Sequence, residues 1–317
     1  MWDRRTVLGM LPAAALVGCG SKTEPASKKP VIAIAYALGG KGDQNYNDAA
    51  AKALPQLKQK YEIQEYAPLS PEEYSRALSI VASGDAKLIF CVGFIYDTFV
   101  NQMARRYTDK TFCVLDGAPT AARAFGVQFR VREAAALAGA VAADRSRSKI
   151  LGFVGGSDIP PITPFVEGFE YGARRLQPSV KVLKTYIGSG AEAFTNAARG
   201  HDRALELIRQ GADVLFHAAG SSGAGVIAAA REKHCLAVGV DVNQSSLAPE
   251  TVITSVLKRL DVAILRVTDL FFRGIKLPHP TLELGLRDQA VDIVPPSGLS
   301  PEGEAAIRAL REEFARG

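Results

Sequence analysis

The sequence predicts an α/β protein built of two Rossmann-like lobes, each with a parallel sheet covered by helices. Two observations predict this fold. Short apolar runs alternate with amphipathic segments from Val31 onward, and a second series of the same kind begins after Ala124. The apolar runs lack the polar alternation of a half-exposed strand, which is typical of strands buried in a parallel sheet. The chain has 317 residues, enough for two domains of ordinary size.

In the first series, each amphipathic segment separates two apolar runs. We expect strands at residues 31–36, 63–66, 87–92 and 111–115, and helices at 48–61, 71–83 and 98–107. The second series opens with an alanine-rich segment. Here we expect helices at residues 132–143, 164–176, 193–210, 223–233, 260–273 and 301–314, and strands at 149–155, 181–186, 214–217, 236–240 and 252–256.

The chain is expected to cross between the lobes more than once, with the segment after Asp241 returning to the first lobe. We place the crossovers near residues 124–127, near Thr254 and near Gly285. The predicted N-terminal lobe then comprises residues 30–126 and 255–285. The predicted C-terminal lobe comprises residues 127–254 and 286–317.

The first residues have the layout of a bacterial lipoprotein signal. Arg4 and Arg5 precede an apolar run at residues 6–18, which is too short for a membrane-spanning helix. The run ends in Leu-Val-Gly before Cys19, as in a lipobox. We expect residues 1–18 to be a signal peptide, Cys19 to carry the lipid, and the polar residues 19–29 to form a tether. The alternative is an ordinary hydrophobic segment with an incidental cysteine.

The remaining cysteines and the charge exclude several classes of protein. Cys91, Cys113 and Cys235 lie in apolar segments and are expected to be buried small side chains, with a Cys91–Cys113 disulfide left open. No Cys/His spacing suits a metal, and we expect no cofactor. The net charge of +5 comes from scattered basic residues, which argues against nucleic acid as a partner.

Ligands of open parallel sheets bind outside the carboxyl ends of the strands, so the loops there matter most. The loop after the first strand is rich in glycine but lacks the dinucleotide and P-loop patterns. It contains Asp43, Asn45, Tyr46 and Asn47, a carboxylate, an aromatic ring and amides that suit hydroxyl groups and a flat heterocycle. The alternative is a helix-capping turn, in which Asp43 or Asn47 only accepts hydrogen bonds from backbone amides.

This loop resembles the Asp-x-Ser-Phe-Asn loop of the basic membrane protein family of lipoproteins, which includes purine nucleoside receptors. Further matches to the family follow in the same order along the chain. They are Asp116 at a strand end, residues 134–143, Gly168-Phe169, residues 216–223, residues 239–244 and residues 254–258.

The resemblance implies a periplasmic-binding-protein type I fold with a nucleoside held in a cleft between the lobes. It implies that Tyr46 stacks on one face of the base, and Phe216 is the candidate for the other. Asp116 and Asn47 would bind the base edge, while Asp241 and Lys258 would hold the ribose hydroxyls. Asn45 and Gly220 complete the predicted ligand-binding residues. For Phe216 the alternative is a core residue, for Asp116 and Asp241 it is a turn cap, and for Lys258 it is a solvated residue on the helix that opens near it.

We therefore predict a monomeric, extracytoplasmic solute-binding protein that is not an enzyme. It would deliver a purine nucleoside or nucleobase to the permease subunits of an ABC importer. One alternative is a nucleoside hydrolase that uses Asp43, Asp116 or Asp241 as acid or base, although no set of nucleophile, base and orienting group is evident. Another alternative is a ligand sensor or adhesin with the same cleft.

Overall fold

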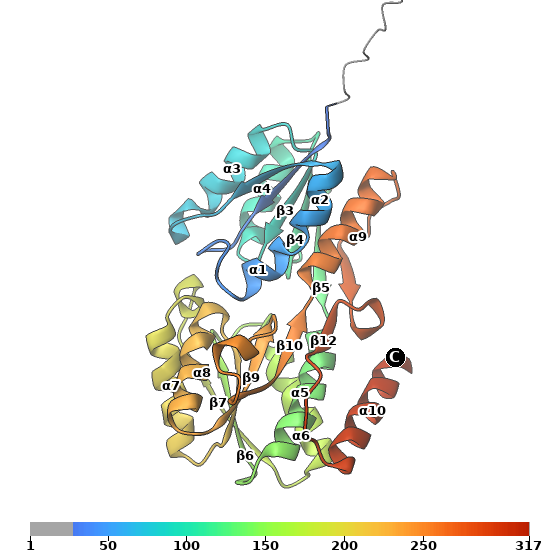
Figure 1. Ribbon diagram of the computed structural model, residues 1–317. Coiled ribbons are helices and arrows are strands. Elements are labelled where there is room, and N and C mark those ends of the chain that lie inside the picture. Colours follow the sequence, from blue (N-terminus) through green and yellow to red (C-terminus); the bar gives the residue numbers. More distant parts are fainter. Residues whose placement is uncertain (1–27, 317) are drawn as a thin grey trace, which may run out of the picture.

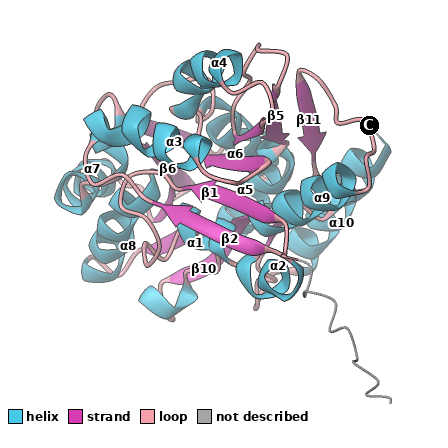
Figure 2. Cartoon of the chain, turned by 90° about the horizontal axis from the view of Figure 1, so that it is seen from above, coloured by secondary structure: helices cyan, strands magenta, loops and turns pink. Residues whose placement is uncertain are grey.

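The computed structural model describes residues 28–316, which form two lobes, each built on a six-stranded sheet (Figure 1). The predicted signal peptide, Cys19 and the tether up to residue 27 lie outside the described residues. Helices lie on both sides of the strands (Figure 2). Among the described residues, none of the helices is long and apolar enough to cross a membrane. The predicted α/β class is confirmed.

The N-terminal lobe contains a fully parallel sheet in the order β11-β5-β4-β3-β1-β2. Its strands are β1 (Val31–Ala35), β2 (Glu62–Tyr66), β3 (Leu88–Val92), β4 (Thr111–Leu115), β5 (Ala124–Phe129) and β11 (Thr281–Leu284). Its helices are α1 (Tyr46–Ala51), α2 (Leu54–Lys60), α3 (Tyr74–Ser83), α4 (Tyr96–Arg106) and α9 (Leu260–Phe272).

The C-terminal lobe repeats this plan in the order β12-β10-β9-β8-β6-β7, with only the pairing of β12 to β10 antiparallel. Its strands are β6 (Ile150–Gly155), β7 (Lys181–Tyr186), β8 (Val214–Ala218), β9 (Leu236–Asp241), β10 (Val252–Lys258) and β12 (Val291–Ile293). Its helices are α5 (Val131–Arg145), α6 (Thr163–Leu176), α7 (Ala197–Arg209), α8 (Gly223–Glu232) and α10 (Pro301–Arg316).

The central strands β1, β3 and β8 are buried along their whole length, as the unbroken apolar runs predicted. Cys91 on β3 and Cys113 on β4 are both buried free thiols. Cys91 lies in register with Val114, so the neighbouring Cys113 points to the opposite face of the sheet. A disulfide between the two is therefore ruled out by geometry.

Helices α5 and α6 pack closely because glycines remove side chains from their contact. A β-carbon on Gly172 would lie 1.7 Å from the carbonyl oxygen of Ala136, and one on Gly139 would lie 2.1 Å from that of Phe169. No side chain fits into either space. The pair forms one wall of the C-terminal lobe, with α10 alongside (Figure 1).

The crossovers between lobes differ slightly from the prediction. The first lies at Arg130 between β5 and α5, the second at Arg259 between β10 and α9, and the third at residues 285–290. The predicted boundaries at residues 126 and 254 fall inside β5 and β10, and each of these strands pairs within a single sheet. Backbone bonds link the crossovers, from the Arg130 amide to the Leu284 carbonyl and from the Arg259 amide to the Ala290 carbonyl.

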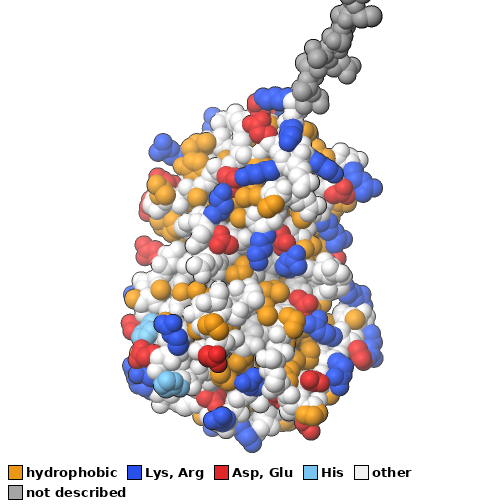
Figure 3. All heavy atoms as spheres, viewed as in Figure 1, with side chains coloured by type: hydrophobic (Ala, Val, Ile, Leu, Met, Phe, Trp, Pro, Cys, Tyr) orange, Lys and Arg blue, Asp and Glu red, His pale blue; other side chains and the backbone are white. Residues whose placement is uncertain are grey.

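Acidic and basic side chains are interspersed over the face drawn in Figure 3, on both lobes. This face shows no continuous basic surface, in keeping with the scattered basic residues of the sequence.

Candidate ligand-binding site

A cavity lies between the lobes, and interfaces between domains are a preferred place for small-molecule sites. Its walls come mainly from the segments after β1, β3 and β4 of one lobe, and from those after β6, β7, β8 and β9 and the end of β10 of the other. The carboxyl ends of the strands in both sheets thus face one another across the cavity, as the topology of parallel sheets requires.

Tyr46 forms one wall of the cavity as the first residue of α1. Its hydroxyl donates to Oδ2 of Asp116, at 2.6 Å. Burial, with the nearby Asp116 carboxylate, raises the pKa of Tyr46 well above its ordinary value, so this hydroxyl remains a donor. Asp116 follows β4 with a φ of +61°, a left-handed conformation that aspartate tolerates better than most residues.

Lys258 reaches the same carboxylate from the other lobe. It ends β10, its residue is 5 % exposed, and its Nζ lies 2.8 Å from Oδ2 of Asp116. The ammonium also lies 5.0 Å from the ring centroid of Phe165 and 5.3 Å from that of Tyr46. Cation–π attraction therefore adds to the ion pair.

Asp241 ends β9 with a φ of +64° and lines the cavity. None of the hydrogen bonds recorded among residues 28–316 involves its carboxylate. Burial raises its pKa to about 7; the charges of Asp116 and Asp43 act in the same direction, and Lys258 opposes them. Asp241 is therefore free to accept hydrogen bonds from a ligand.

Asp43 and Asn47 line the cavity, but their polar atoms are largely occupied by the backbone. The Asp43 carboxylate accepts from the amides of Asn45, Asn47 and Asp48 at 2.9–3.1 Å. The Asn47 side chain accepts from the Ala37 amide at 2.9 Å and donates to the Ala37 carbonyl at 3.4 Å. The capping turn weighed as an alternative is thus present. It fixes the loop that presents Tyr46.

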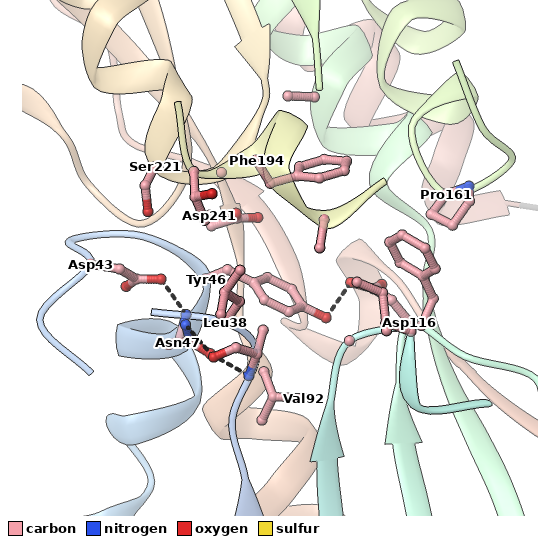
Figure 4. Close-up of a pocket in the computed structure, with 18 of the residues that line it drawn as sticks. Leu38, Asp43, Tyr46, Asn47, Val92, Asp116, Pro161, Phe194, Ser221 and Asp241 are labelled. Carbon is pink, nitrogen blue, oxygen red and sulfur yellow. Dashed lines mark hydrogen bonds between the residues drawn. The ribbon is translucent and has the colours of Figure 1, made fainter. Parts of the chain in front are cut away.

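Phe216 does not line the cavity, and its predicted role in stacking is wrong. It is fully buried in β8, with its ring centroid 5.0 Å from that of Phe169 and 5.6 Å from that of Phe153. Two other aromatic side chains line the cavity from this lobe: Phe165 on α6, and Phe194, which ends a 3₁₀ turn at Ala191–Phe194. In Figure 4 the Phe194 ring lies across the cavity from Tyr46.

Of two further predicted residues, Asn45 and Gly220, only Gly220 lines the cavity. Asn45 is 1 % exposed and does not line the cavity, so it is not placed to contact a ligand there. Gly220 does line it, with a φ of +54°. A β-carbon at Gly220 would lie 2.9 Å from the carbonyl oxygen of Phe194, so glycine leaves room for the turn that carries the aromatic ring.

Among residues 28–316, no nucleophilic side chain is hydrogen-bonded to His217. The His217 side chain is buried in β8, its Nε2 lies 3.0 Å from Oε1 of Gln244, and burial lowers its pKa to about 4. It is therefore neutral near pH 7. Within residues 28–316 no group of His, Cys, Asp and Glu side chains is arranged to hold a metal ion.

Comparison with known proteins agrees with this geometry. The sequence profile described as "ABC transporter substrate-binding protein PnrA-like" matches residues 31–313. An uncharacterized lipoprotein of Pyrococcus abyssi is 30 % identical, over 96 % of this chain and 79 % of the relative. Basic membrane protein D of Borreliella burgdorferi is 29 % identical, over 88 % of this chain and 83 % of the relative.

A solved structure is also similar. The solute-binding protein of an ABC transporter system from Aeropyrum pernix K1 superimposes with a TM-score of 0.75 at 25 % identity, covering 90 % of this chain and 86 % of that protein. The predicted two-lobe fold of the periplasmic-binding-protein type I class is confirmed by this likeness.

Proposed function

The chain belongs to the family of PnrA-like ABC transporter substrate-binding proteins, and we propose that its ligand is a purine nucleoside or nucleobase, which it delivers to an ABC importer. The observation that carries the proposal is the arrangement of the cleft. Two aromatic side chains from different lobes, Tyr46 and Phe194, lie on opposite sides of the cavity, and carboxylates lie beyond them at either end (Figure 4).

The cleft contains aromatic and hydrogen-bonding groups suited to a flat heterocyclic ring. Aromatic stacking is worth about 1–3 kcal/mol per base in nucleic-acid binders and tolerates any base. Asp116 would accept from the N–H groups of the base edge. The carboxylate of Asp241, which has no recorded protein partner among the described residues, would accept from the ribose hydroxyls, with the Lys258 ammonium as a donor. The Asn47 amide is held by Ala37, so Asp116 is the main group for the base edge.

We further propose that the protein acts on the outer side of the membrane, anchored by a lipid on Cys19 after removal of residues 1–18. Support comes from the lipobox-like sequence before Cys19 and from the relatives named as lipoproteins. Residues 20–29 would then tether the two lobes close to the permease.

Binding without turnover is the third part of the proposal. Of the groups that line the cavity, Asp43 is engaged with backbone amides and Asp116 with Tyr46 and Lys258. A hydrolase would require a positioned base beside a nucleophile or water. Asp241 alone does not provide that set.

Calorimetry of the purified protein against a panel of compounds tests the function. The panel is guanosine, inosine, adenosine, the free bases, ribose, glucose and galactose. We expect purine nucleosides or bases to bind with micromolar or tighter affinity, and to add about 2.7 kcal/mol to the free energy of unfolding at a hundredfold excess over Kd. Binding of the sugars alone would contradict the proposal.

Chromatography of the recovered ligand tests the absence of turnover. We expect the nucleoside to be recovered unchanged after prolonged incubation, and release of the free base would instead favour the hydrolase. Uptake of labelled nucleoside by vesicles that contain the cognate permease would separate a transport receptor from a sensor or adhesin.

A further inference from the structure

We propose that the Tyr46 hydroxyl is a specificity element. It occupies a hydrogen-bonding position on Asp116 that the 2-amino group of guanine would need, so the cleft binds inosine at least as well as guanosine. This inference rests on the proposed function and concerns the choice among purines within the same cleft.

Oδ2 of Asp116 receives two donors. The Tyr46 hydroxyl lies 2.6 Å from it and the Lys258 ammonium 2.8 Å from it. A carboxylate oxygen has two lone pairs, so both acceptor positions of Oδ2 are filled. No hydrogen bond to Oδ1 is recorded among residues 28–316, and this oxygen is the one that a ligand can use.

The packing around each donor holds it near Oδ2, and the Leu115 carbonyl, 3.3 Å from the Tyr46 hydroxyl, is a longer and weaker alternative acceptor. Tyr46 begins α1, whose first amides are held by the Asp43 carboxylate. Lys258 is 5 % exposed, and its ammonium lies near three aromatic rings, those of Phe165, Tyr46 and Phe129. The arrangement around Oδ2 is therefore built into both lobes.

Guanine and hypoxanthine differ in the hydrogen-bond donors that they present to the Asp116 carboxylate. Guanine presents N1–H and a 2-amino N–H side by side, a pair that matches both oxygens of one carboxylate, whereas hypoxanthine presents N1–H alone. With Oδ2 filled, only one of the two guanine donors finds an acceptor. The unpaired amino group then loses its water in a narrow cleft without compensation, which is unfavourable.

The other carboxylates have different partners in the proposed complex: Asp43 accepts from three backbone amides, and Asp241 faces the ribose hydroxyls. Asp43 and Asp241 lie on the far side of Tyr46 from Asp116 in the cavity (Figure 4). The residue that decides the preference is therefore Tyr46.

Calorimetric Kd values of guanosine and inosine for wild type and Tyr46→Phe test the inference. Phenylalanine keeps the ring and frees one lone pair of Oδ2. We expect wild type to bind inosine as tightly as guanosine or more tightly. In Tyr46→Phe the ratio of the two affinities should shift toward guanosine by roughly tenfold, the effect of one hydrogen bond to a charged group.

Tyr36→Phe is the matched control, because it removes a hydroxyl that donates to the Glu65 carboxylate at 3.0 Å outside the cavity lining. Its affinity ratio should equal that of wild type. A folded Tyr46→Phe protein with an unchanged ratio overturns the inference. So does wild type that binds guanosine tenfold more tightly than inosine, whether or not the variant folds. Failure of every purine nucleoside and nucleobase to bind wild type would overturn the proposed function as well, and thus differs from failure of the inference alone.

Discussion

The ammonium of Lys258 and the carboxylate of Asp116 form an ion pair between the lobes, with Nζ 2.8 Å from Oδ2. Lys258 ends β10 of the C-terminal lobe, and Asp116 follows β4 of the N-terminal lobe. The two side chains are only 6 % and 14 % exposed. Because both charges are shielded from water, removing one partner would leave a buried charge uncompensated, which is unfavourable in the closed arrangement of the lobes.

Lys258→Met should therefore open the cleft and weaken ligand binding. The neutral side chain keeps much of the volume, while Asp116 is left next to the other acidic groups of the cavity and becomes better solvated when the lobes separate. We expect a larger radius of gyration of the ligand-free protein in small-angle scattering, and at least a tenfold weaker affinity in calorimetry.

Lys87→Met is the control for loss of a lysine charge. Lys87 pairs with Asp109 at 2.6 Å, but both side chains are more than half exposed. Exposed pairs contribute about 0–1 kcal/mol, so scattering and affinity should match wild type. An equal effect of Lys258→Met and Lys87→Met would show that the ion pair between the lobes does not stabilise their closure.

Phe194 and Phe216 should respond to substitution in opposite ways. Phe194→Ala removes an aromatic wall of the cavity and should weaken nucleoside binding by about 1–3 kcal/mol, with little change in melting temperature. Phe216→Leu leaves a void among Phe153, Phe165 and Phe169 and should lower the free energy of unfolding by about 1–3 kcal/mol. Its ligand affinity should stay near that of wild type.

Calorimetry and urea unfolding of both variants separate the two effects. If a folded Phe216→Leu protein loses affinity as strongly as Phe194→Ala, Phe216 contributes to ligand binding after all. Wild-type affinity of Phe194→Ala would remove Phe194 from the binding site.

The sequence predicts some of the cavity residues for a reason that holds in any parallel sheet. Asp116 and Asp241 each end an apolar run, and the carboxyl ends of parallel strands meet at one edge. Both residues line the cavity. Their place could be predicted because it depends only on strand order along the chain.

The aromatic residues could not be assigned in this way. Leu215, Phe216 and His217 are all buried, because β8 is covered on both faces, so the pattern of polarity does not reveal which face each side chain occupies. Phe194 lies in a short 3₁₀ turn where a longer helix was expected from residue 193. Its position depends on how that turn packs, which no local pattern encodes.

Two further features could not be predicted from the sequence because they depend on pairing between distant parts of the chain. Lys258 and Asp116 are 142 residues apart, and neither side chain signals its partner in the sequence. The strands β11 and β12 contain four and three residues and were not predicted. Such short strands exist because an adjacent strand offers hydrogen-bonding partners, which is a property of the fold and not of the segment itself.

Asp241 should make the stability of the ligand-free protein depend on pH. Burial raises its pKa from the ordinary 3.8 to about 7, so the folded protein favours the neutral carboxyl. Below about pH 4 the group is neutral in both the folded and unfolded states. Between pH 4 and 7 the unfolded state gains stability by ionising first, so the contribution of Asp241 to folding falls as pH rises and is constant above pH 7.

The substitution Asp241→Asn removes this dependence. We expect the variant to gain stability relative to wild type as pH rises from 4 to 7, by at most about 4 kcal/mol, since one pKa unit corresponds to ~1.4 kcal/mol. Urea unfolding at several pH values measures the difference. Asp85→Asn, at a side chain that is 72 % exposed, should show little change with pH. A flat difference for Asp241→Asn would contradict the raised pKa.

Ligand affinity should change with pH in the opposite direction. Ribose hydroxyls donate to a carboxylate more strongly when it is ionised, so a bound nucleoside should lower the pKa of Asp241 and release a proton. Affinity for the nucleoside is therefore expected to rise between pH 6 and 8, and calorimetry in buffers of different ionisation enthalpy should detect the released proton.

Asp116, Asp43 and Lys258 face the same cavity and remain in Asp241→Asn, so they serve as an internal control. The variant should bind more weakly and without the pH slope. If affinity falls from pH 6 to 8, the ligand instead accepts a hydrogen bond from the protonated Asp241, and the assignment of this residue to ribose hydroxyls is wrong.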